Sequence, residues 1–567
     1  MQKRWVIKDD LNQEVLSALS EQLDISSSLA GLLVQRDINS FNEAKAFFRP
    51  NIDQMHDPFL MKDMDKAVNR LTEAIGNEEK ILVYGDYDVD GTTSVATFYG
   101  FLSQFYDKLE YYIPDRYKEG YGVSEEGIKY AAENGYTLIV TLDCGIKAVD
   151  KIALAKKSGI DVIICDHHTP GEKLPEAFAI LDPKREDCDY PYKELSGCGV
   201  GFKLLHGFSI QSGVDLNILF DYLDLLAVSI ASDIVPLTGE NRVMAHFGLK
   251  KLNSSPRPGL QALLDLCRGN KLMTISSIVF GIGPRINAAG RMDHAGSAVE
   301  LLLAKNQEDA KLLADTVNTK NDARRDFDSS ITEEAIEMIS TNDALSTAKS
   351  TVLFKDSWHK GVIGIVASRC IEKFYRPTVI LTESNDKVTG SARSVDGFNV
   401  YEAISECSEL LDQFGGHMYA AGVTMPVHNV NAFRIKFEEV VSKKITKDQL
   451  TPSIYVDSIL DLEEIDRKFY NIISQMAPFG PKNMQPLFVT KNIQASNVKL
   501  LKEQHLKFTA KQAGTNIAIE AIGFGLGDYY DLVNCGLEFG MAFTIEENDF
   551  RGQNTLQLFV KDIEFED

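Results

Sequence analysis

Long apolar stretches, paired cysteines and basic charge are all scarce in this sequence of 567 residues. No apolar run reaches the roughly 18 residues that a membrane-spanning helix requires, so we expect no membrane contact. The first residues, MQKRWVIKDDLNQEV, lack the apolar core of a signal peptide. The eight cysteines form no C-x-x-C pair. This pattern argues against a disulfide framework and favours a reducing cytoplasm.

The shortage of basic residues bears on what the protein binds. Lys and Arg total 59 against 82 Asp and Glu, which gives a formal net charge of −23. A protein that binds nucleic acid non-specifically is normally basic over its binding face, so the bulk charge argues against such binding. A cleft, however, is governed by its own lining. We therefore expect a local positive cleft, built from basic side chains that cluster late in the chain: Lys355, His359, Lys360, Arg369 and Arg393.

The most informative segment is residues 81–94, ILVYGDYDVDGTTS. Its short apolar run, residues 81–84, predicts a buried strand. Asp86, Asp88 and Asp90 follow on alternate positions, at the carboxyl end where open α/β sheets place their sites. Three carboxylates this close repel one another unless a cation lies among them. The segment therefore predicts a divalent-metal site.

Three other interpretations of this segment are open. It could be an acidic turn without a ligand. It could be a calcium loop of the EF-hand type, although that loop needs a Glu at its twelfth position, which here is Thr97. Residues 88–92, DVDGT, also resemble the opening motif of the haloacid dehalogenase phosphatases, but no later segment supplies the Lys and paired aspartates of that group.

Repetition of the pattern favours the metal site. Three further apolar segments end in acidic or imidazole groups, and four such endings in one region predict ligands that converge on a single edge of a sheet. The segments are 137–143 (TLIVTLD, ending in Asp143), 160–168 (IDVIICDHH, ending in Asp166, His167 and His168) and 225–233 (LLAVSIASD, ending in Asp233).

The ligand types narrow the choice of metal. Carboxylates with one or two imidazoles suit Mn²⁺ or Mg²⁺, and no thiolate cluster favours zinc. Two such ions would activate a water and hold a phosphoryl oxygen during an in-line displacement. The local charge is consistent with two ions, because five carboxylates surround the predicted site: Asp86, Asp88, Asp90, Asp143 and Asp233.

In their order along the chain, these four motifs resemble those of the DHH phosphoesterase superfamily. The first motif is most similar to that of the RecJ family of single-strand-specific DNA exonucleases. Related pyrophosphatases and nano-RNases usually carry a His where this chain has Tyr84. Further segments resemble the RecJ family and its DHH-associated domain: 281–291 (GIGPRINAAGR), 361–369 (GVIGIVASR), 390–394 (GSARS) and 415–417 (GGH).

The resemblance and the residue patterns together predict an α/β fold. Its parts are a parallel-sheet DHH domain, a long connecting helix, a second α/β DHH-associated domain and a C-terminal β-barrel of the OB type. We expect the connecting helix to span residues 297–340. The predicted domains are a helical cap (1–45), the DHH catalytic domain (46–260), a connecting helical region (261–345), a DHH-associated substrate-binding domain (346–450) and the OB-fold domain (451–567).

Alternating apolar residues predict the strands of the barrel, including a hairpin whose turn lies around residues 549–553. OB-folds commonly bind single strands. We expect the barrel aromatics Phe508, Phe524 and Phe543 to lie in its core.

The resemblance implies roles for the site residues. Asp88 and Asp90 favour different metal ions, Asp143 bridges the two ions, and His167 and Asp233 join Asp90. Asp86 is a ligand or an outer acceptor, Asp166 orients the imidazoles, and His168 contacts the scissile phosphate. The residues expected to bind DNA or its 5′ phosphate are Arg116, Ser391, Arg393, His417, Arg285, Arg291 and Arg369.

The resemblance further implies hydrolysis of single-stranded DNA from its 5′ end to 5′-mononucleotides, in DNA recombination and repair. Single-stranded DNA is then the substrate, a single-strand-binding protein and a helicase are expected partners, and we expect a cytoplasmic monomer. Two alternatives are a DHH phosphodiesterase that acts on short RNA or cyclic dinucleotides, and a non-catalytic DHH replication scaffold. Tyr84 and the large C-terminal barrel argue against the first, and the completeness of all four motifs argues against the second.

Overall fold

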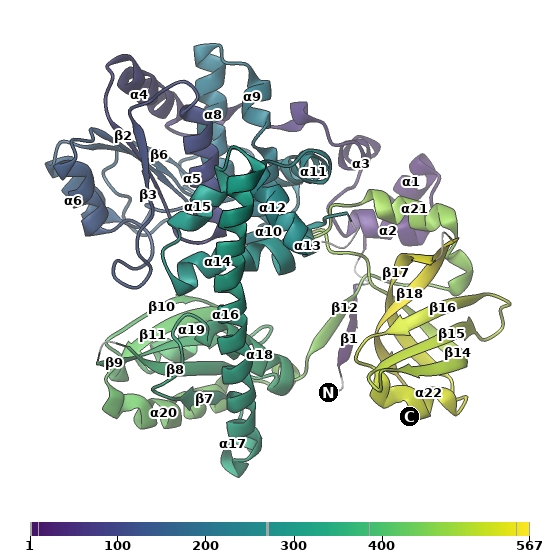
Figure 1. Cartoon of the computed structure of the whole chain (residues 1–567). Coiled ribbons are helices and arrows are strands. Elements are labelled where there is room, and N and C mark those ends of the chain that lie inside the picture. Colours follow the sequence, from purple (N-terminus) through teal and green to yellow (C-terminus); the bar gives the residue numbers. More distant parts are fainter. Residues whose placement is uncertain (1–2, 9–10, 268–271, 385, 551–552, 566–567) are drawn as a thin grey trace. The chain divides into compact units, whose positions relative to one another are not determined.

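The structure, a computed structural model, describes the whole chain except residues 1–2, 9–10, 268–271, 385, 551–552 and 566–567 (Figure 1). The chain divides into two compact units. The smaller unit contains residues Met1–Val6, Arg291–Asp293 and Asn318–Ile454. The larger unit contains Ile7–Gly290, His294–Val317 and Tyr455–Asp567. Within the described residues, no helix combines the length and the apolar character needed to cross a bilayer.

The larger unit contains a five-stranded sheet in which every strand pair is parallel, as the sequence predicts. Both faces of its central strands are buried, because alternate residues enter different cores. Ile81 and Val83 belong to one core cluster, and Leu82 and Tyr84 belong to another. The strand order is β3 (Leu109–Tyr112), β2 (Ile81–Gly85), β4 (Leu138–Leu142), β5 (Asp161–Cys165) and β6 (Ala179–Leu181).

Helices cover both faces of this sheet, as a parallel sheet requires (Figure 1). One core cluster contains residues of α4 (Met64–Gly76), α5 (Val89–Leu102) and α8 (Gly197–Ser212). The other contains residues of α6 (Glu125–Glu133) and α7 (Val149–Lys157). Because helices cover both faces, side chains from different strands can meet at the edge formed by the carboxyl ends of the strands.

The apolar segment 225–233, which we grouped with the strand endings, is not a strand. It lies in a helix, α10 (Leu223–Ser232), and Asp233 is the residue that caps the carboxyl end of that helix. All of its residues from Leu223 to Ala231 are buried. A helix buried on every side shows no amphipathic period, so its sequence looks the same as that of a buried strand.

The chain between residues 216 and 302 forms further helices. They are α9 (Leu216–Phe220), α11 (Gly239–Ser254), α12 (Pro258–Cys267), α13 (Ile275–Ser277), the π-helical turn η3 (Ile278–Ile282), α14 (Gly283–Met292) and α15 (Gly296–Leu302).

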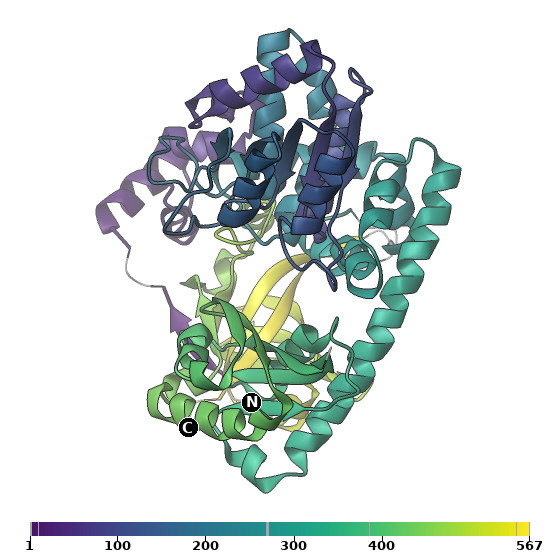
Figure 2. The same cartoon turned by 90° about the vertical axis from the view of Figure 1, so that its left-hand side faces the viewer.

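The predicted single helix over residues 297–340 is wrong at its beginning. The chain forms α15 and then a separate helix, α16 (Gln307–Ser340), which Figures 1 and 2 show as one long rod. Asn306 causes the break, because its side-chain oxygen accepts a hydrogen bond from the backbone N–H of Asp309 at 2.9 Å. This is the geometry of a helix N-cap.

The smaller unit contains a mixed five-stranded sheet. Its order is β10 (Gln413–His417), β11 (Ala420–Met425), β9 (Lys387–Arg393), β8 (Thr378–Ser384) and β7 (Thr351–Phe354). Only β7 and β8 pair in parallel. The helices that follow α16 in this unit are α17 (Asp343–Thr347), α18 (Ile363–Phe374), α19 (Val400–Ser405) and α20 (Val430–Lys444).

The C-terminal strands form a barrel, because β14 pairs with both β15 and β17 and so closes the sheet. The predicted hairpin is β17 with β18, although residues 551–552 of its turn lie outside the described residues. Phe508 and Phe543 lie in the core as predicted, whereas Phe524 is 52% exposed. The elements are β13 (Ser458–Ile459), α21 (Arg467–Gln475), β14 (Phe488–Leu501), β15 (His505–Gln512), β16 (Ala518–Gly523), α22 (Tyr530–Asn534), β17 (Phe539–Phe550) and β18 (Gln553–Glu564).

The N-terminal segment packs on this barrel. After the short strand β1 (Arg4–Ile7), which pairs with β12 (Ser453–Val456), the chain forms α1 (Gln13–Leu23), α2 (Ser27–Val34) and α3 (Phe41–Phe48). Leu19 and Leu32 share one hydrophobic core with Phe469 and Phe488. The two ends of the chain therefore stabilise each other.

Candidate metal centre

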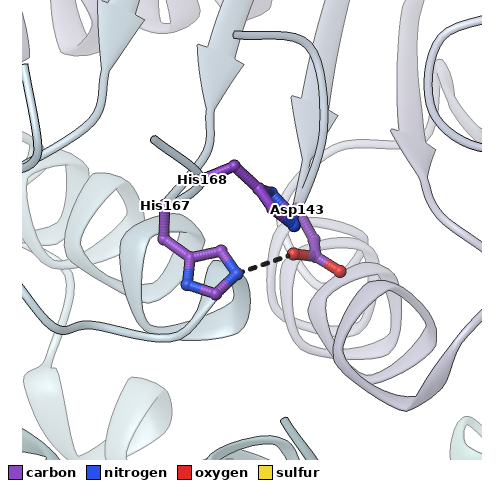
Figure 3. A group of neighbouring side chains, drawn as sticks. All are labelled: Asp143, His167 and His168. Carbon is purple, nitrogen blue, oxygen red and sulfur yellow. Dashed lines mark ion pairs between the residues drawn. The ribbon is translucent and has the colours of Figure 1, made fainter. Parts of the chain in front are cut away.

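The parallel sheet brings the predicted strand-end residues together. Gly85 of β2 is in register with Leu142 of β4, and Leu142 is in register with Cys165 of β5. The residues that follow these strands therefore meet at one edge of the sheet. Figure 3 shows three of them, Asp143, His167 and His168, with both imidazole rings close to the carboxylate.

His167 lies at the centre of the group. Its Nε2 atom is 3.2 Å from Oδ1 of Asp143, 3.5 Å from Oδ2 of Asp233 and 3.7 Å from Oδ2 of Asp90 (Figure 3 draws the first of these). The ligand atoms of Asp90, His167 and Asp233 all lie within 4.8 Å of one another, as do those of Asp143, His167 and His168. The helix end that carries Asp233 thus reaches the same point as the strand ends.

The donor atoms of this group fit a divalent cation. Both carboxylate oxygens of Asp143 and both ring nitrogens of His167 are buried without a hydrogen-bond partner. Burial, together with the charges of Asp90 and Asp88, raises the pKa of Asp143 well above its usual range. A cation among these oxygens would satisfy them and reverse that effect. Carboxylate and imidazole donors without thiolate are the set that Mn²⁺ and Mg²⁺ accept.

Asp90 is held by partners that the sequence analysis did not identify. Its carboxylate accepts hydrogen bonds from the backbone N–H groups of Gly197 at 2.6 Å and Cys198 at 2.9 Å. The hydroxyl of Ser229 donates a third at 2.7 Å. The amino end of α8, where backbone N–H groups are unpaired, therefore fixes this carboxylate in place.

Gly197 also leaves the space that the Asp143 side chain occupies. A Cβ atom at this position would lie 2.5 Å from both Cβ and Oδ1 of Asp143. The only signal for this contact in the sequence is the glycine-rich run 196–201, SGCGVG, which opens α8. A glycine-rich helix start indicates close backbone approach, but it does not show which side chain approaches.

The other two carboxylates of the first motif take different positions. Asp88 caps α5, because its Oδ1 atom accepts from the backbone N–H of Gly91 at 3.0 Å. Its charge contributes to the raised pKa values of Asp86 and Asp143, which places it beside the group. Asp86 is fully buried and accepts from the N–H groups of Tyr87 and Gly122. Asp86 therefore positions the loop that contains Gly122.

Asp166 orients His168 rather than His167. Its Oδ1 atom lies 2.7 Å from Nδ1 of His168 and accepts from both imidazole residues' backbone N–H groups. Burial raises the pKa of Asp166, but the hydrogen bond and charge of His168 outweigh it and lower the pKa to about 2. For His168, burial lowers the pKa, but Asp166 raises it to about 9.

Tyr121 is a further residue that the sequence analysis did not identify. Its hydroxyl lies 3.2 Å from Nε2 of His168. Its ring also packs edge-on against Tyr87, with a centroid separation of 5.8 Å. The guanidinium of Arg116 lies over the Tyr87 ring, 5.0 Å from its centre. Tyr87 in the loop after β2 and Tyr121 in the loop after β3 thus connect Arg116 with His168.

Ser391 and Arg393, two predicted phosphate-binding residues, lie together on β9 of the smaller unit. A guanidinium nitrogen of Arg393 donates to the Ser391 hydroxyl at 2.9 Å. Among the described residues, no ion pair joins Arg393 to a carboxylate, and burial lowers its pKa. Gly364 leaves space for the pair, because a Cβ there would lie 2.8 Å from Arg393 and 2.9 Å from Ser391.

The other predicted DNA-binding residues are less concentrated. Arg369 pairs with Asp328 at 2.8 Å, and Lys355 pairs with Glu334, so two of the five basic residues expected to form a positive cleft have acidic partners. Of the remaining three candidates, His417 is exposed at the end of β10. Arg285 and Arg291 both lie on α14 and donate to the backbone carbonyls of Gly281 and Gly361, respectively.

Sequence comparisons place this geometry in a family. The chain matches the DHH family N-terminal domain over residues 80–230, the DHHA1 domain over 347–443 and the RecJ OB domain over 456–562. The first of these ranges contains Asp86 to His168, and the second contains Ser391 and Arg393. The fold resembles that of Thermus thermophilus RecJ solved with Mn²⁺, with a TM-score of 0.85 and 25% identity over 100% of this chain and 80% of that one. An exonuclease RecJ bound to manganese has a TM-score of 0.60 and 32% identity, over 69% of this chain and 96% of the other.

Curated relatives agree with the structural matches. The single-stranded-DNA-specific exonuclease RecJ of Bacillus subtilis is 36% identical over 99% of this chain and 70% of its own length. The Salmonella typhimurium protein of the same name is 32% identical over 89% of this chain and 90% of its own. At this identity and coverage, the chain belongs to the RecJ family.

Proposed function

We propose that the protein is a metal-dependent exonuclease that hydrolyses single-stranded DNA from the 5′ end to 5′-mononucleotides, in DNA recombination and repair. The observation that carries the proposal is the convergence of Asp90, Asp143 and Asp233 on the buried Nε2 atom of His167. Family membership supplies the substrate class, because the curated relatives are named as single-stranded-DNA-specific exonucleases.

The proposed cofactors are two divalent cations, Mn²⁺ or Mg²⁺, the ions named with the solved relatives. When bound, they would supply an activated water and neutralise charge on the scissile phosphate. The residues proposed to hold them are Asp88, Asp90, Asp143, His167 and Asp233. The hydrogen bonds from Gly197, Cys198 and Ser229 hold the Asp90 carboxylate in an orientation that faces the group.

His168 is proposed to act on the phosphate rather than on an ion. Because Nδ1 faces Asp166, Nε2 is the nitrogen that can turn to a substrate, which would then replace its contact with the Tyr121 hydroxyl. The contact between Nδ1 and Asp166 fixes a ring orientation in which Nε2–H can donate to a phosphate oxygen and stabilise charge there. Asp166 and Asp86 then act as positioning residues, the first for the imidazole and the second for the Gly122 loop.

Arginine side chains are proposed to bind the DNA backbone. Arg393 is the strongest case, because it is the basic residue of β9 that lacks a carboxylate partner among the described residues and has Ser391 beside it. Arg116 is proposed to bind the 5′ phosphate as well. His417, Arg285, Arg291 and Arg369 are proposed contacts to other phosphates, and Arg369 would have to exchange Asp328 for DNA.

The proposal includes a cytoplasmic monomer that acts with a single-strand-binding protein and a helicase.

Polarity mapping tests the proposed 5′ to 3′ direction of hydrolysis and its dependence on metal. Single-stranded oligomers labelled at either end, each with a free or a blocked 5′ terminus, are incubated with Mn²⁺, Mg²⁺ or EDTA. We expect mononucleotides only from free 5′ ends and only with metal. Release from the 3′ end, or equal digestion of a blunt duplex, would contradict the proposal.

The same assay separates the alternatives. A cyclic dinucleotide and a three-residue RNA serve as competing substrates, and we expect slower turnover of both than of single-stranded DNA. A non-catalytic scaffold would release nothing from any substrate. Asp143→Asn is the inactive reference, and Asp107→Asn, at an exposed aspartate, is its matched control.

A further inference from the structure

A pocket of about 500 Å³ opens beside the metal centre. We call it the Tyr121 pocket; its walls include Tyr121, Val123, Ile146, Lys147, Val149 and His168. The pocket lies against the loop after β3 and the first turn of α7. None of the proposed metal ligands lines it. The pocket adjoins the site through Asp166 and His168, but the mechanism above assigns no ligand to the rest of its walls.

His168 belongs both to the pocket and to the proposed metal centre. Its side chain lines the pocket, and it also belongs to the group with Asp143 and His167 whose ligand atoms lie within 4.8 Å of one another. Figure 3 shows its ring beside the Asp143 carboxylate. A phosphate bound at this group would therefore lie beside a side chain that also lines the pocket.

The walls suit a flat ring with an attached polar sugar. Val123 and Ile146 are buried and provide an apolar surface, whereas Tyr121 is 54% exposed. Lys147 is exposed and places a cation at the rim. Ligand pockets of about 300–1,000 Å³ that are mostly apolar with a few polar groups are typical of small-molecule sites. Bases stack on aromatic side chains in single-strand binding proteins.

The Tyr121 ring is held in place from the metal side. The backbone N–H of the next residue, Gly122, donates to the buried carboxylate of Asp86 at 3.2 Å. The Tyr121 ring packs against Tyr87, and its hydroxyl contacts His168. Because these contacts fix one edge of the ring, its exposed face can receive a ligand without rearranging.

We propose that the Tyr121 pocket binds the base and sugar of one nucleotide that adjoins the scissile phosphate. The inference rests on the proposed function, because it takes the phosphate at the metal centre to be that of a DNA strand. It adds a nucleoside site within the larger unit alone.

The first test measures binding without metal or turnover. Saturation-transfer NMR with thymidine in EDTA should show transfer to the thymine methyl and H6 protons. Val149→Phe fills the pocket from the first turn of α7 and should remove this transfer, whereas Val149→Ala should keep it. No transfer to the wild-type protein, or equal transfer to Val149→Phe, would overturn the inference.

A second pair of variants covers the case in which Val149→Phe fails to fold. Lys147→Glu reverses charge at the pocket rim, and Lys157→Glu makes the same change at the far end of α7, outside the pocket. With thymidine 5′-monophosphate as the probe, Lys147→Glu should weaken binding about tenfold, and Lys157→Glu should not. Equal effects would overturn the inference.

The hydrolytic test uses three esters that release 4-nitrophenol: the 5′ and 3′ thymidine 4-nitrophenyl phosphates and bis(4-nitrophenyl) phosphate. Val149→Phe should lower kcat/KM about tenfold for at least one thymidine ester and leave the bis ester unchanged. Equal losses on all three, or no loss, would overturn the inference. If thymidine binds but the wild-type protein releases no nucleotide from single-stranded DNA with metal, the proposed function fails and the nucleoside site stands.

Discussion

Two buried charged clusters in the larger unit differ in how their polar atoms are satisfied. The metal cluster consists of Asp90, Asp143, His167 and Asp233. In the scaffold cluster, Lys203 of α8 and Glu240 of α11 are both fully buried and pair at 2.9 Å. Glu240 also accepts from the Tyr190 hydroxyl at 2.6 Å and from the His56 backbone N–H at 2.8 Å.

The difference shows how a binding site can be told from a structural ion pair. In the scaffold cluster, one cation meets one anion, and backbone and hydroxyl groups use the remaining positions. In the metal cluster, three carboxylates surround a single imidazole, and Asp143 and His167 have buried atoms without partners. Buried polar atoms are rarely left unpaired in a folded protein. The metal cluster is therefore incomplete without a ligand, and the scaffold cluster is complete.

The largest expected effect is on catalysis in the metal cluster. Asp143→Asn removes a charge that both proposed ions need, so we expect kcat on single-stranded DNA to fall about 10³-fold or more, which corresponds to about 4 kcal/mol of activation free energy. Single-turnover release of a 5′ nucleotide measures it, with Asp107→Asn as the control. Near wild-type turnover by Asp143→Asn would place the chemistry elsewhere.

The strand-end half of the metal cluster was predictable from sequence because its signals are local. An apolar run fixes each strand, and a parallel sheet aligns the carboxyl ends, so Asp143 and His167 had to be near the residues that follow β2. Asp233 was predicted at the right place for the wrong reason. Its apolar segment is a buried helix, which shows no period that separates it from a strand.

The partners that complete the site were not predictable in the same way. Ser229 and the N–H groups of Gly197 and Cys198 reach Asp90 from more than 100 residues away along the chain. Only the packing of α8 and α10 against α5 brings them there. Phe524 illustrates the same limit in the barrel, because we expected this aromatic in the core but it is 52% exposed and stacks on Phe559.

The scaffold cluster should respond to mutation in the opposite way. Lys203→Met leaves Glu240 charged and buried without its cation, so we expect the free energy of unfolding to fall by about 3 kcal/mol while kcat of the folded protein is kept. Urea denaturation and turnover at low temperature measure the two quantities. The matched control is Lys156→Met, which breaks the exposed pair with Glu176 and should cost less than about 1 kcal/mol. A loss of kcat with unchanged stability would remove the distinction between the clusters.

Metal should stabilise only a protein with an intact metal cluster. At about 100 times its dissociation constant, an ion that binds only the folded state adds about 2.7 kcal/mol to stability. We expect Mn²⁺ to raise the melting temperature of the wild-type protein and of Lys203→Met, and to have little effect on Asp143→Asn. Differential scanning calorimetry in Mn²⁺ and in EDTA measures the shift. An equal shift in Asp143→Asn would mean that the ion binds elsewhere.

Asp182 shares features with both clusters, because one of its carboxylate oxygens has a partner and the other has none. Its substitution should have the smallest effect of those considered, a pH-dependent change in stability. The residue follows β6 at the same sheet edge and is fully buried; its Oδ1 atom accepts from the Lys184 backbone N–H, whereas Oδ2 has no partner. Burial, with a smaller contribution from Asp166, raises its pKa from 3.8 to about 7. Because the folded state holds this proton more tightly than the unfolded chain, ionisation opposes folding, and its cost appears as the pH rises from about 4 to about 7.

Asp182→Asn removes that cost, so between pH 5 and pH 8 the variant should gain about 2.5 kcal/mol of stability relative to the wild-type protein. Any pH-independent effect of the new amide on the free energy of unfolding cancels when the two pH values are compared. The control variant Asp107→Asn should show no pH-dependent gain of this kind. Urea denaturation at both pH values measures the difference. If the Mn²⁺ shift in melting temperature is also lost in Asp182→Asn, the carboxylate belongs to the metal cluster. If the shift is kept, Asp182 is a buried acid that the scaffold tolerates, and an unpaired oxygen at this edge is not enough to identify a ligand.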